Sequence, residues 1–264
     1  MRRGVWSTAL AVAVALLAGP SVTPVTRAAA EVNAADRNGW GAIAEVWDWE
    51  AGESTNGWNT WANGTGRVAI YYGQLGLDSG PAAFSKTATG DVISWLGNSG
   101  RARGRWEFRI RPREWATATP YRMRLELVPA GTPVNSCGAT TVTLAAWTGL
   151  KSATRIGVRT GHTRWTRAVN IARSDAQFHA IAVEIKNAAM TWYVDGTAVG
   201  RLTAPAAFTT NRLVPRLVLD ATPGAQMTHT KLAIDWSRYY TLDRPGRTVT
   251  ASGLSRSAAI SGQC

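Results

Sequence analysis

Short apolar runs alternate with polar positions along most of the chain, and turn-forming residues separate one run from the next. Gly, Pro, Asn and Asp punctuate the strand-like segments at residues 67–79, 91–97, 104–113, 121–129, 139–147, 155–161, 178–187, 189–202, 214–221 and 231–242. A period of two is typical of strands with one buried face, and no segment keeps a helical period with caps. The pattern predicts one all-β domain, with about 210 residues available for a two-sheet sandwich.

The N-terminus has a different pattern, which sets the expected compartment. A short basic start precedes an apolar run at residues 5–19, and Ala28 and Ala30 stand at the spacing that a signal peptidase accepts. The run is short for a membrane-spanning helix, and no later segment reaches roughly 18 apolar residues. We expect a signal peptide at residues 1–30, with a retained anchor as the alternative. The mature protein is then secreted, with no stable membrane insertion.

Basic residues exceed acidic ones throughout the chain. There are 29 Lys and Arg against 17 Asp and Glu, a formal charge of +12, and cleavage after residue 30 removes three arginines and no acid, leaving 12 − 3 = +9. Such a surface suits polyanions such as acidic cell-wall polymers or anionic polysaccharide, although a role in solubility alone is the alternative. The arginines are scattered along the sequence and accompany no nucleic-acid motif, so we expect no nucleic-acid partner.

The two cysteines of the chain are Cys137 and Cys264, the last residue. In an oxidising compartment such a pair predicts one disulfide, which would tie the Ser/Gly-rich tail at residues 244–264 to the middle of the chain. Two free thiols, or a bridge between molecules, are the alternatives. We favour the internal bridge and expect a monomer.

The segment "FHAIAVEIKNAAMTWYVDGTAVG" at residues 178–200 predicts two hairpins, with turns at Lys186-Asn187 and Asp195-Gly196. It resembles the "FHxYAVEW…ITWYVDG" segment of glycoside hydrolase family 16, the laminarinase and endo-β-1,3-glucanase group. Three other stretches resemble that family in the same order: "GQLGLDSG", "GRARGRWEFRIR" and "KLAIDWSRYYTL", the last preceded by "LVLD" where actinobacterial members read "QLDW". The resemblance covers residues 65–242. It implies a concanavalin A-like jelly roll of two antiparallel sheets, with an open cleft for a glycan chain, over a domain at residues 31–243.

The strand that carries the catalytic acids in that family reads differently here. The family pattern is E-x-D-x-x-E or E-x-D-x-E, in which the first Glu is the nucleophile and the last is the general acid/base. The resemblance places the nucleophile on Ala139, the central Asp on Thr141, and the acid/base on Thr143 or on Leu144 if a bulge is present. Retaining hydrolysis needs two carboxyl groups about 5–5.5 Å apart, and none of these four side chains ionises.

The strand expected at residues 121–129 borders the cleft. Alternation turns its apolar side chains inward, and the outward-facing ones are Arg122, Arg124 and Glu126. Glu126 is the one weak candidate to replace a catalytic acid, but the guanidinium two residues away would lower its pKa and favours a structural Arg–Glu pair. Asp220 is a candidate acceptor for a sugar hydroxyl.

Thirteen tryptophans are many for this length, and some are candidates to stack on sugar rings. Trp95, Trp115 and Trp147 lie in or beside cleft-bordering segments, although sandwich cores use large aromatic residues as well. Four more, between residues 47 and 61, would cover the open end of the sandwich or add a subsite. The three histidines lack metal-ligand spacing, and we expect no metal and no cofactor.

Together these features predict a secreted, non-catalytic protein of the family 16 type that binds a polysaccharide or cell-wall glycan, with a preference for an anionic one. The candidate glycan-binding residues are Trp95, Trp115, Arg122, Arg124, Thr141, Thr143, Trp147 and Asp220. An active glycosidase using non-standard residues is the second interpretation. A structural envelope protein whose groove is filled by its own tail is the third.

Overall fold

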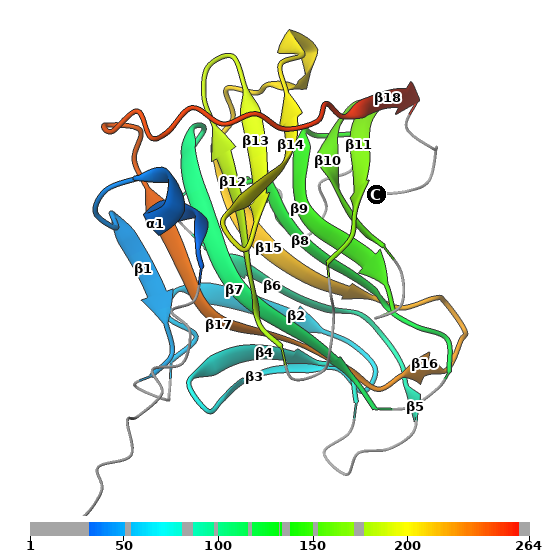
Figure 1. Cartoon of the computed structure of the whole chain (residues 1–264). Helices are drawn as coiled ribbons and strands as arrows, with labels where there is room; N and C mark the ends of the chain where they lie inside the picture. Colours follow the sequence, from blue (N-terminus) through cyan, green and yellow to red (C-terminus); the bar gives the residue numbers. More distant parts are fainter. Residues whose placement is uncertain are drawn as a thin grey trace, which may run out of the picture. The chain divides into compact units, whose positions relative to one another are not determined.

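Two antiparallel sheets of eight strands each make up most of the structure (Figure 1). Side chains from both sheets pack between them. The computed structural model describes residues 32–50, 54–80, 87–97, 100–115, 118–131, 133, 138–149, 153–171 and 177–258. The predicted all-β sandwich is therefore confirmed. The predicted signal peptide at residues 1–30 and both cysteines, Cys137 and Cys264, lie outside the described residues. The signal peptide and the disulfide stay predictions.

The first sheet has the strand order β14-β13-β12-β7-β17-β4-β3, and β1 pairs with β17. Its strands are β1 (Glu45–Asp48), β3 (Arg67–Tyr71), β4 (Gln74–Asp78), β7 (Gly104–Glu114), β12 (His179–Ile185), β13 (Met190–Val194), β14 (Thr197–Leu202) and β17 (Thr230–Tyr240). The short helix α1 (Ala34–Asn38) packs on β12 and is capped by the Asn33 side chain, which accepts from the backbone of Asp36 at 2.8 Å.

The second sheet has the order β18-β11-β10-β9-β8-β15-β6-β2. Its strands are β2 (Trp58–Ala62), β6 (Val92–Leu96), β8 (Arg122–Pro129), β9 (Thr141–Thr148), β10 (Thr154–Thr160), β11 (Thr163–Val169), β15 (Leu213–Asp220) and β18 (Ser255–Ala258). A small third sheet pairs β5 (Thr87–Ala88) with β16 (Met227–Thr228), and a 3-10 turn, η1, spans Pro205–Ala207. Among the described residues, no helix is long and apolar enough to span a membrane.

The core lies between the two large sheets and follows the alternation read from the sequence. On β8, Met123, Leu125 and Leu127 have no exposed surface. Trp192 of the first sheet is also fully buried, and its Nε1 donates to the backbone oxygen of Thr143 in the second sheet at 2.9 Å. Because this bond satisfies the indole N–H, a large aromatic side chain joins the two layers without leaving a buried donor unpaired.

Two tight turns shape the hairpins of the first sheet. Asp195 and Gly196 have φ of 47° and 72° and join β13 to β14, as the sequence predicted. Tyr72 and Gly73, with φ of 50° and 71°, divide the apolar run at residues 67–79 into β3 and β4. Two successive left-handed residues are typical of a type I′ turn. Asp-Gly is a common sequence for this turn and Tyr-Gly is not, so the turn at Tyr72-Gly73 was not predicted from the sequence.

Both ends of the domain extend beyond the strands expected from the sequence. Of the four early tryptophans, Trp47, Trp49 and Trp58 join the core, whereas Trp61 of β2 is 40% exposed. At the other end, β18 pairs with β11, and the Arg201 backbone of β14 donates to the Ser252 oxygen at 3.0 Å. The described part of the predicted tail thus runs along the edges of both sheets (Figure 1).

Candidate functional site

A bulge in β9 decides which of its side chains reach the outer face of the second sheet, the face turned away from the core. Glu126 of β8 lies opposite Thr143 and Leu125 lies opposite Ala145, so Leu144 is an extra residue in β9. β10 shows the same shift against β9. A bulge adds one residue to a strand and resets its alternation. The core-facing side chains of β9 are Val142, Leu144, Ala145 and Trp147, and the outer face carries Thr141, Thr143 and Ala146.

Two adjoining hollows lie on this outer face, with volumes of about 560 and 190 Å³. They share residues from β8, β9, β10 and β11. We call them together the arginine groove, after the side chains that line them: Arg122, Arg124, Arg155, Arg159 and Arg164. The outward-facing residues of β9 form its floor.

Strand pairing brings these arginines together from separate parts of the sequence. Ala146 lies opposite Arg124 on one side and opposite Arg155 on the other. Arg159 of β10 lies opposite Arg164 of β11. Directly paired residues point to the same face of a sheet, so each pairing places a guanidinium over the same groove. Arg155 is exposed and has no ion pair among the residues that the structure describes.

The acids beside the groove are held in ion pairs. Glu126 is 3% exposed and accepts from Arg216 at 2.7 Å and from Arg124 at 3.3 Å. Asp220 lies 2.7 Å from Arg124 and 3.1 Å from Arg122. These contacts make a continuous chain of alternating charges across β8 and β15. Asp220, expected as an acceptor for sugar hydroxyls, is already engaged by two guanidinium groups.

The network controls the charge of its members. Burial alone would raise the pKa of Glu126, but Arg124 and Arg216 outweigh it and hold that pKa below its ordinary value. Burial and the same two guanidinium groups lower the pKa of Arg159, against the opposing effect of Glu126. A carboxyl held ionised in this way is a poor proton donor, as the sequence predicted for Glu126.

The tryptophans predicted to stack on sugars lie in three different places. Trp95 of β6 is opposite Arg216, so it shares the outer face and is partly exposed. Trp147 is 6% exposed and packs in the core, because the bulge turns it inward, but it still lines part of the larger hollow of the groove. Trp115 follows β7 in the first sheet and stacks on His229 with ring centroids 4.6 Å apart.

The bulge also changes where the acid motif expected from the resemblance falls. Ala139 precedes β9, and Leu144 is buried in the core, so neither lies on the groove floor. The spacing E-x-D-x-x-E is matched instead by the three outward residues Thr141, Thr143 and Ala146. Ala146 is a groove residue that the sequence analysis missed. The sequence feature that could have revealed it is the pair Leu144-Ala145, two successive apolar residues that interrupt the alternation and mark the bulge.

No carboxylate stands on this floor, because the outward-facing side chains of β9 there are Thr141, Thr143 and Ala146. The buried acid Glu107 lies away from the groove, on β7 of the first sheet beneath α1, where it accepts from the Ala34 backbone. Within the described ranges, no three His, Cys, Asp or Glu side chains come close enough together to hold a metal ion. The groove therefore offers guanidinium and hydroxyl groups for binding and no pair of carboxyl groups for acid–base chemistry.

Comparison by sequence finds no relative: no family model matches the chain, and no curated protein does. Comparison of structures finds many. The catalytic domain of an endo-1,3-β-glucanase (laminarinase) from Thermotoga petrophila RKU-1 matches with a TM-score of 0.59 at 11% identity, over 77% of this chain and 98% of that one. A β-glucanase from Bacillus licheniformis matches with a TM-score of 0.53 at 14% identity, over 76% of this chain and 100% of that one.

A third structure comes from work on endo-acting O-glycanases that members of the human gut microbiota use to initiate mucin breakdown. It matches with a TM-score of 0.57 at 19% identity, over 76% of this chain and 100% of that one. All three have sequences that differ greatly from this chain. The chain therefore has the jelly-roll fold of glycan-cleaving enzymes such as β-glucanases and laminarinases.

Proposed function

We propose that the chain is an exported protein of the glycoside hydrolase family 16 type that binds an anionic polysaccharide or cell-wall glycan in the arginine groove without cleaving it. The observation that carries the proposal is the composition of the groove. Five arginines line it, while Thr141, Thr143 and Ala146 stand on its floor where an acid motif would be. The glycan-cleaving enzymes that share the fold support a glycan as the ligand.

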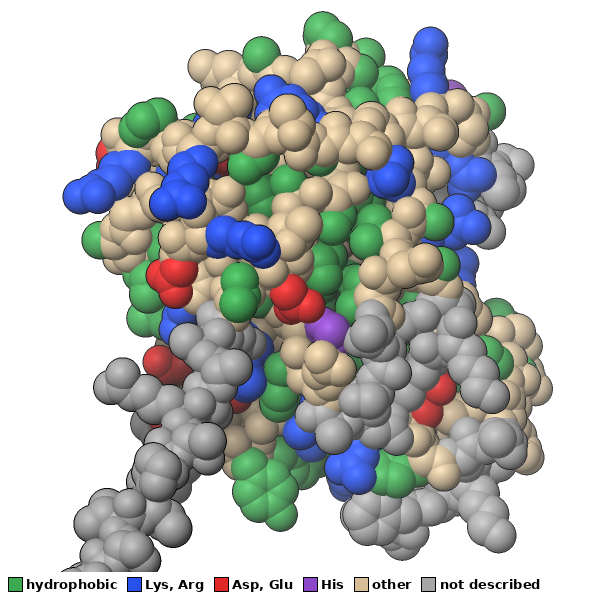
Figure 2. Space-filling model, viewed as in Figure 1, with side chains coloured by type: hydrophobic (Ala, Val, Ile, Leu, Met, Phe, Trp, Pro, Cys, Tyr) green, Lys and Arg blue, Asp and Glu red, His purple; other side chains and the backbone are tan. Residues whose placement is uncertain are grey.

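The chemistry of the groove favours negative charge on that glycan. Arg122 has 52% of its side chain exposed, and Arg155 is exposed as well, so both can reach a ligand. A guanidinium donates two parallel hydrogen bonds to carboxylate, sulfate or phosphate. Figure 2 shows more basic than acidic side chains on the face in view, and the chain has 29 Lys and Arg against 17 Asp and Glu, so the general field also favours an anion.

Hydrolysis of β-glucans is expected to be absent. Incubation with laminarin should release no reducing ends above a buffer blank, because two cooperating carboxyl groups are needed and the groove floor has none. A single acid introduced on the floor by Thr141→Glu should leave the protein inactive for the same reason, and so should Ala139→Glu, which lies before β9. Turnover by the wild-type protein that is lost in Glu126→Gln, with the variant still folded, would establish the alternative of a glycosidase with non-standard residues.

Binding is expected to prefer acidic over neutral polysaccharide. Affinity for a uronate-rich or sulfated polymer should exceed that for laminarin and should fall between low and high salt, since salt screens exposed charges. Arg122→Gln combined with Arg155→Gln should weaken acidic-polymer binding about tenfold or more, because charge-assisted hydrogen bonds are lost. The matched control is Arg247→Gln, an exposed arginine outside the groove.

Equal affinity for both polymer classes, unaffected by salt and by the double substitution, would contradict the anionic preference. Arg124 is left intact in this design because it belongs to the ion-pair network of Glu126 and Asp220. A pull-down with isolated cell wall separates glycan binding from the third interpretation, a structural envelope protein. The described part of the tail favours binding of an external glycan, because β18 pairs with β11 at the edge of the sheet and adds no residue to the lining of the groove.

A further inference from the structure

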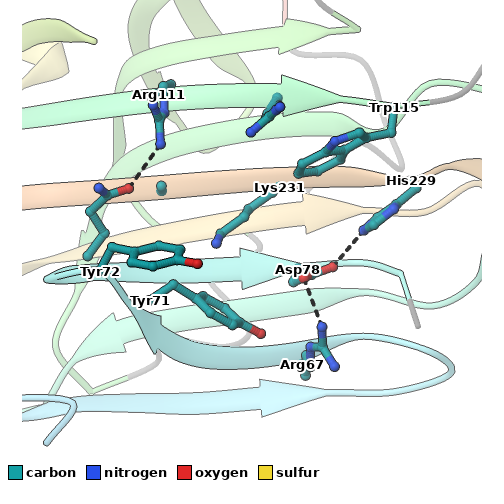
Figure 3. Close-up of a pocket in the computed structure, with 11 residues that line it drawn as sticks. Arg67, Tyr71, Tyr72, Asp78, Arg111, Trp115, His229 and Lys231 are labelled. Atoms are coloured by element: carbon teal, nitrogen blue, oxygen red, sulfur yellow. Dashed lines mark hydrogen bonds and ion pairs between the residues drawn. The ribbon is translucent and has the colours of Figure 1, made fainter. Parts of the chain in front are cut away.

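A second hollow lies on the outer face of the first sheet, over β3, β4, β17 and β7 (Figure 3). Its volume is about 390 Å³. We call it the basic hollow, because Arg67, Arg111, Arg113 and Lys231 line it together with a single carboxylate, Asp78. The arginine groove lies on the other large sheet, so the chemistry of the basic hollow stands apart from the function proposed above.

The one acid of the basic hollow is already occupied. Asp78 lies 3.2 Å from Arg67 and 2.9 Å from Nε2 of His229. Figure 3 shows both contacts at the same carboxylate. Arg111 is hydrogen-bonded to the neutral amide of Gln74 at 3.3 Å. Within the part of the chain that the structure describes, none of Arg111, Arg113 and Lys231 has an ion pair.

Register places these three cations side by side. Arg113 of β7 lies opposite Lys231 of β17, and Arg111 lies opposite Ala233, the next outward position along β17. Directly opposed side chains in an antiparallel sheet lie about 5 Å apart at their β-carbons, and like charges at that spacing repel one another. The described part of the sheet therefore holds three cations without an ion pair over one small area.

Partial burial makes this repulsion stronger than on an open surface, although an aromatic ring offsets part of it at Lys231. The Lys231 ammonium lies 3.6 Å from the centre of the Tyr71 ring. Partial burial, together with the positive charges of Arg111, Arg67 and Arg113, lowers the pKa of Lys231 to about 8 against the opposing effect of Asp78. Burial and the neighbouring Arg113 and Arg109 likewise lower the pKa of Arg111. An anion bound between these groups would relieve the repulsion.

An aromatic side chain stands at the rim of the same hollow. Tyr72 is 98% exposed and is held outward by the tight turn between β3 and β4. Figure 3 shows Lys231 pointing towards Tyr71 and Tyr72. The Tyr71 ring is covered by the ammonium group, whereas the Tyr72 ring is open to solvent. An exposed ring beside a cluster of donors suits a ligand with an anionic group and an apolar face, as a substituted sugar has.

We propose that the basic hollow binds a tetrahedral oxyanion ester on a sugar, a phosphate or a sulfate, with Arg111, Arg113 and Lys231 donating to its oxygens and Tyr72 packing on the sugar ring. Three separate cationic donors match the three free oxygens of such an ester better than the two oxygens of a carboxylate. The site is a second anion-binding surface on the outer face of the first sheet, whereas the arginine groove lies on the outer face of the second sheet.

The experiment is an NMR titration of the lysine side chains. The chain has four lysines, at positions 86, 151, 186 and 231, so isotope-labelled lysine gives few signals, and Lys231→Gln assigns the relevant one. Near pH 8, glucose 6-phosphate or glucose 6-sulfate should shift the Lys231 signal saturably and raise the pH at which it titrates. Comparing the two esters identifies which one the site prefers, and glucose and glucuronic acid should bind at least tenfold more weakly than the better ester.

Two variants and a control separate the parts of the site. Arg113→Gln changes an exposed side chain and should weaken binding of the ester about tenfold. Tyr72→Ala should keep the affinity for inorganic phosphate and lose the advantage of the sugar ester over it. Arg122→Gln with Arg155→Gln alters the arginine groove and should leave the Lys231 titration unchanged, so failure at one site is distinguishable from failure at the other.

The proposal is overturned if neither ester shifts the Lys231 signal saturably, or if the shift persists unchanged in Arg113→Gln. Glucuronic acid binding as tightly as the esters would show a general carboxylate site and would overturn the assigned ligand chemistry. Loss of the shift in the groove variant would overturn the assignment to the basic hollow.

Discussion

Glu126→Gln is expected to lower the free energy of unfolding by about 3–5 kcal/mol, the range for breaking one side of a buried ion pair. Glu126 and Arg216 are each 3% exposed, and their charged groups lie 2.7 Å apart. The amide keeps the shape of the side chain but removes the charge that compensates Arg216. The second partner, Arg124, still contacts Asp220 at 2.7 Å, so the penalty falls mainly on Arg216. Urea unfolding of both proteins measures the difference.

The matched control is Arg122→Gln, on the same strand and in the same network. Its side chain is 52% exposed, and its contact with Asp220 is 3.1 Å, so the loss should stay within about 1 kcal/mol. A double-mutant cycle with Arg216→Gln should show that the Glu126 and Arg216 substitutions are not additive. Losses of equal size in Glu126→Gln and Arg122→Gln would show that burial does not strengthen this pair.

The second large effect is a loss of stability with rising pH through Glu107. Its side chain has no exposed surface, and burial raises its pKa from the ordinary 4.5 to about 7, although the backbone N–H groups of Ala34 and Ala35 and the charge of Arg238 oppose the shift. The folded state therefore binds the Glu107 proton between pH 4.5 and 7, where the unfolded state releases it. Stability should then fall as pH rises through this window, by about 2–3 kcal/mol between pH 5 and 8.

Glu107→Gln removes the titration and isolates this contribution. The free energy of unfolding of the variant should rise relative to that of the wild-type protein from pH 5 to pH 8. The difference should level off once Glu107 is ionised in both the folded and the unfolded state. Denaturant unfolding at several pH values measures it, and other titrating groups cancel in the comparison. A difference between the two proteins that is constant over this range would contradict the raised pKa of Glu107.

Local features of the fold were predictable because they depend on neighbouring residues in the chain. Alternation on the strand at residues 121–129 correctly placed Met123 and Leu125 in the core and Arg124 and Glu126 on the outer face. The Asp-Gly pair at residues 195 and 196 correctly marked a hairpin. Side-chain direction along a strand and backbone preference in a turn are set within a few residues, so sequence alone contains them.

The placement of the candidate site residues differs from the sequence-based expectation mainly at one feature of β9. The β-bulge at Leu144-Ala145 turned Trp147 into the core and brought Ala146 onto the groove floor. A bulge is a property of two paired strands, since it exists only where two residues oppose one. Matching the family pattern to the sequence alone therefore placed the first position of the expected acid motif on Ala139, which precedes β9.

The sequence by itself determined the fold class, the faces of its regular strands and the lack of ionisable side chains on the β9 segment. Only the tertiary structure decided which charges are neighbours. The strand order β11-β10-β9-β8 brings three arginines of β10 and β11 beside those of β8: Arg155, Arg159 and Arg164 beside Arg122 and Arg124. In the first sheet, β17 pairs with β7, so Lys231 lies opposite Arg113. Arginines scattered along the chain become two cationic surfaces because pairing partners in a sheet are selected by long-range packing, which no local pattern encodes.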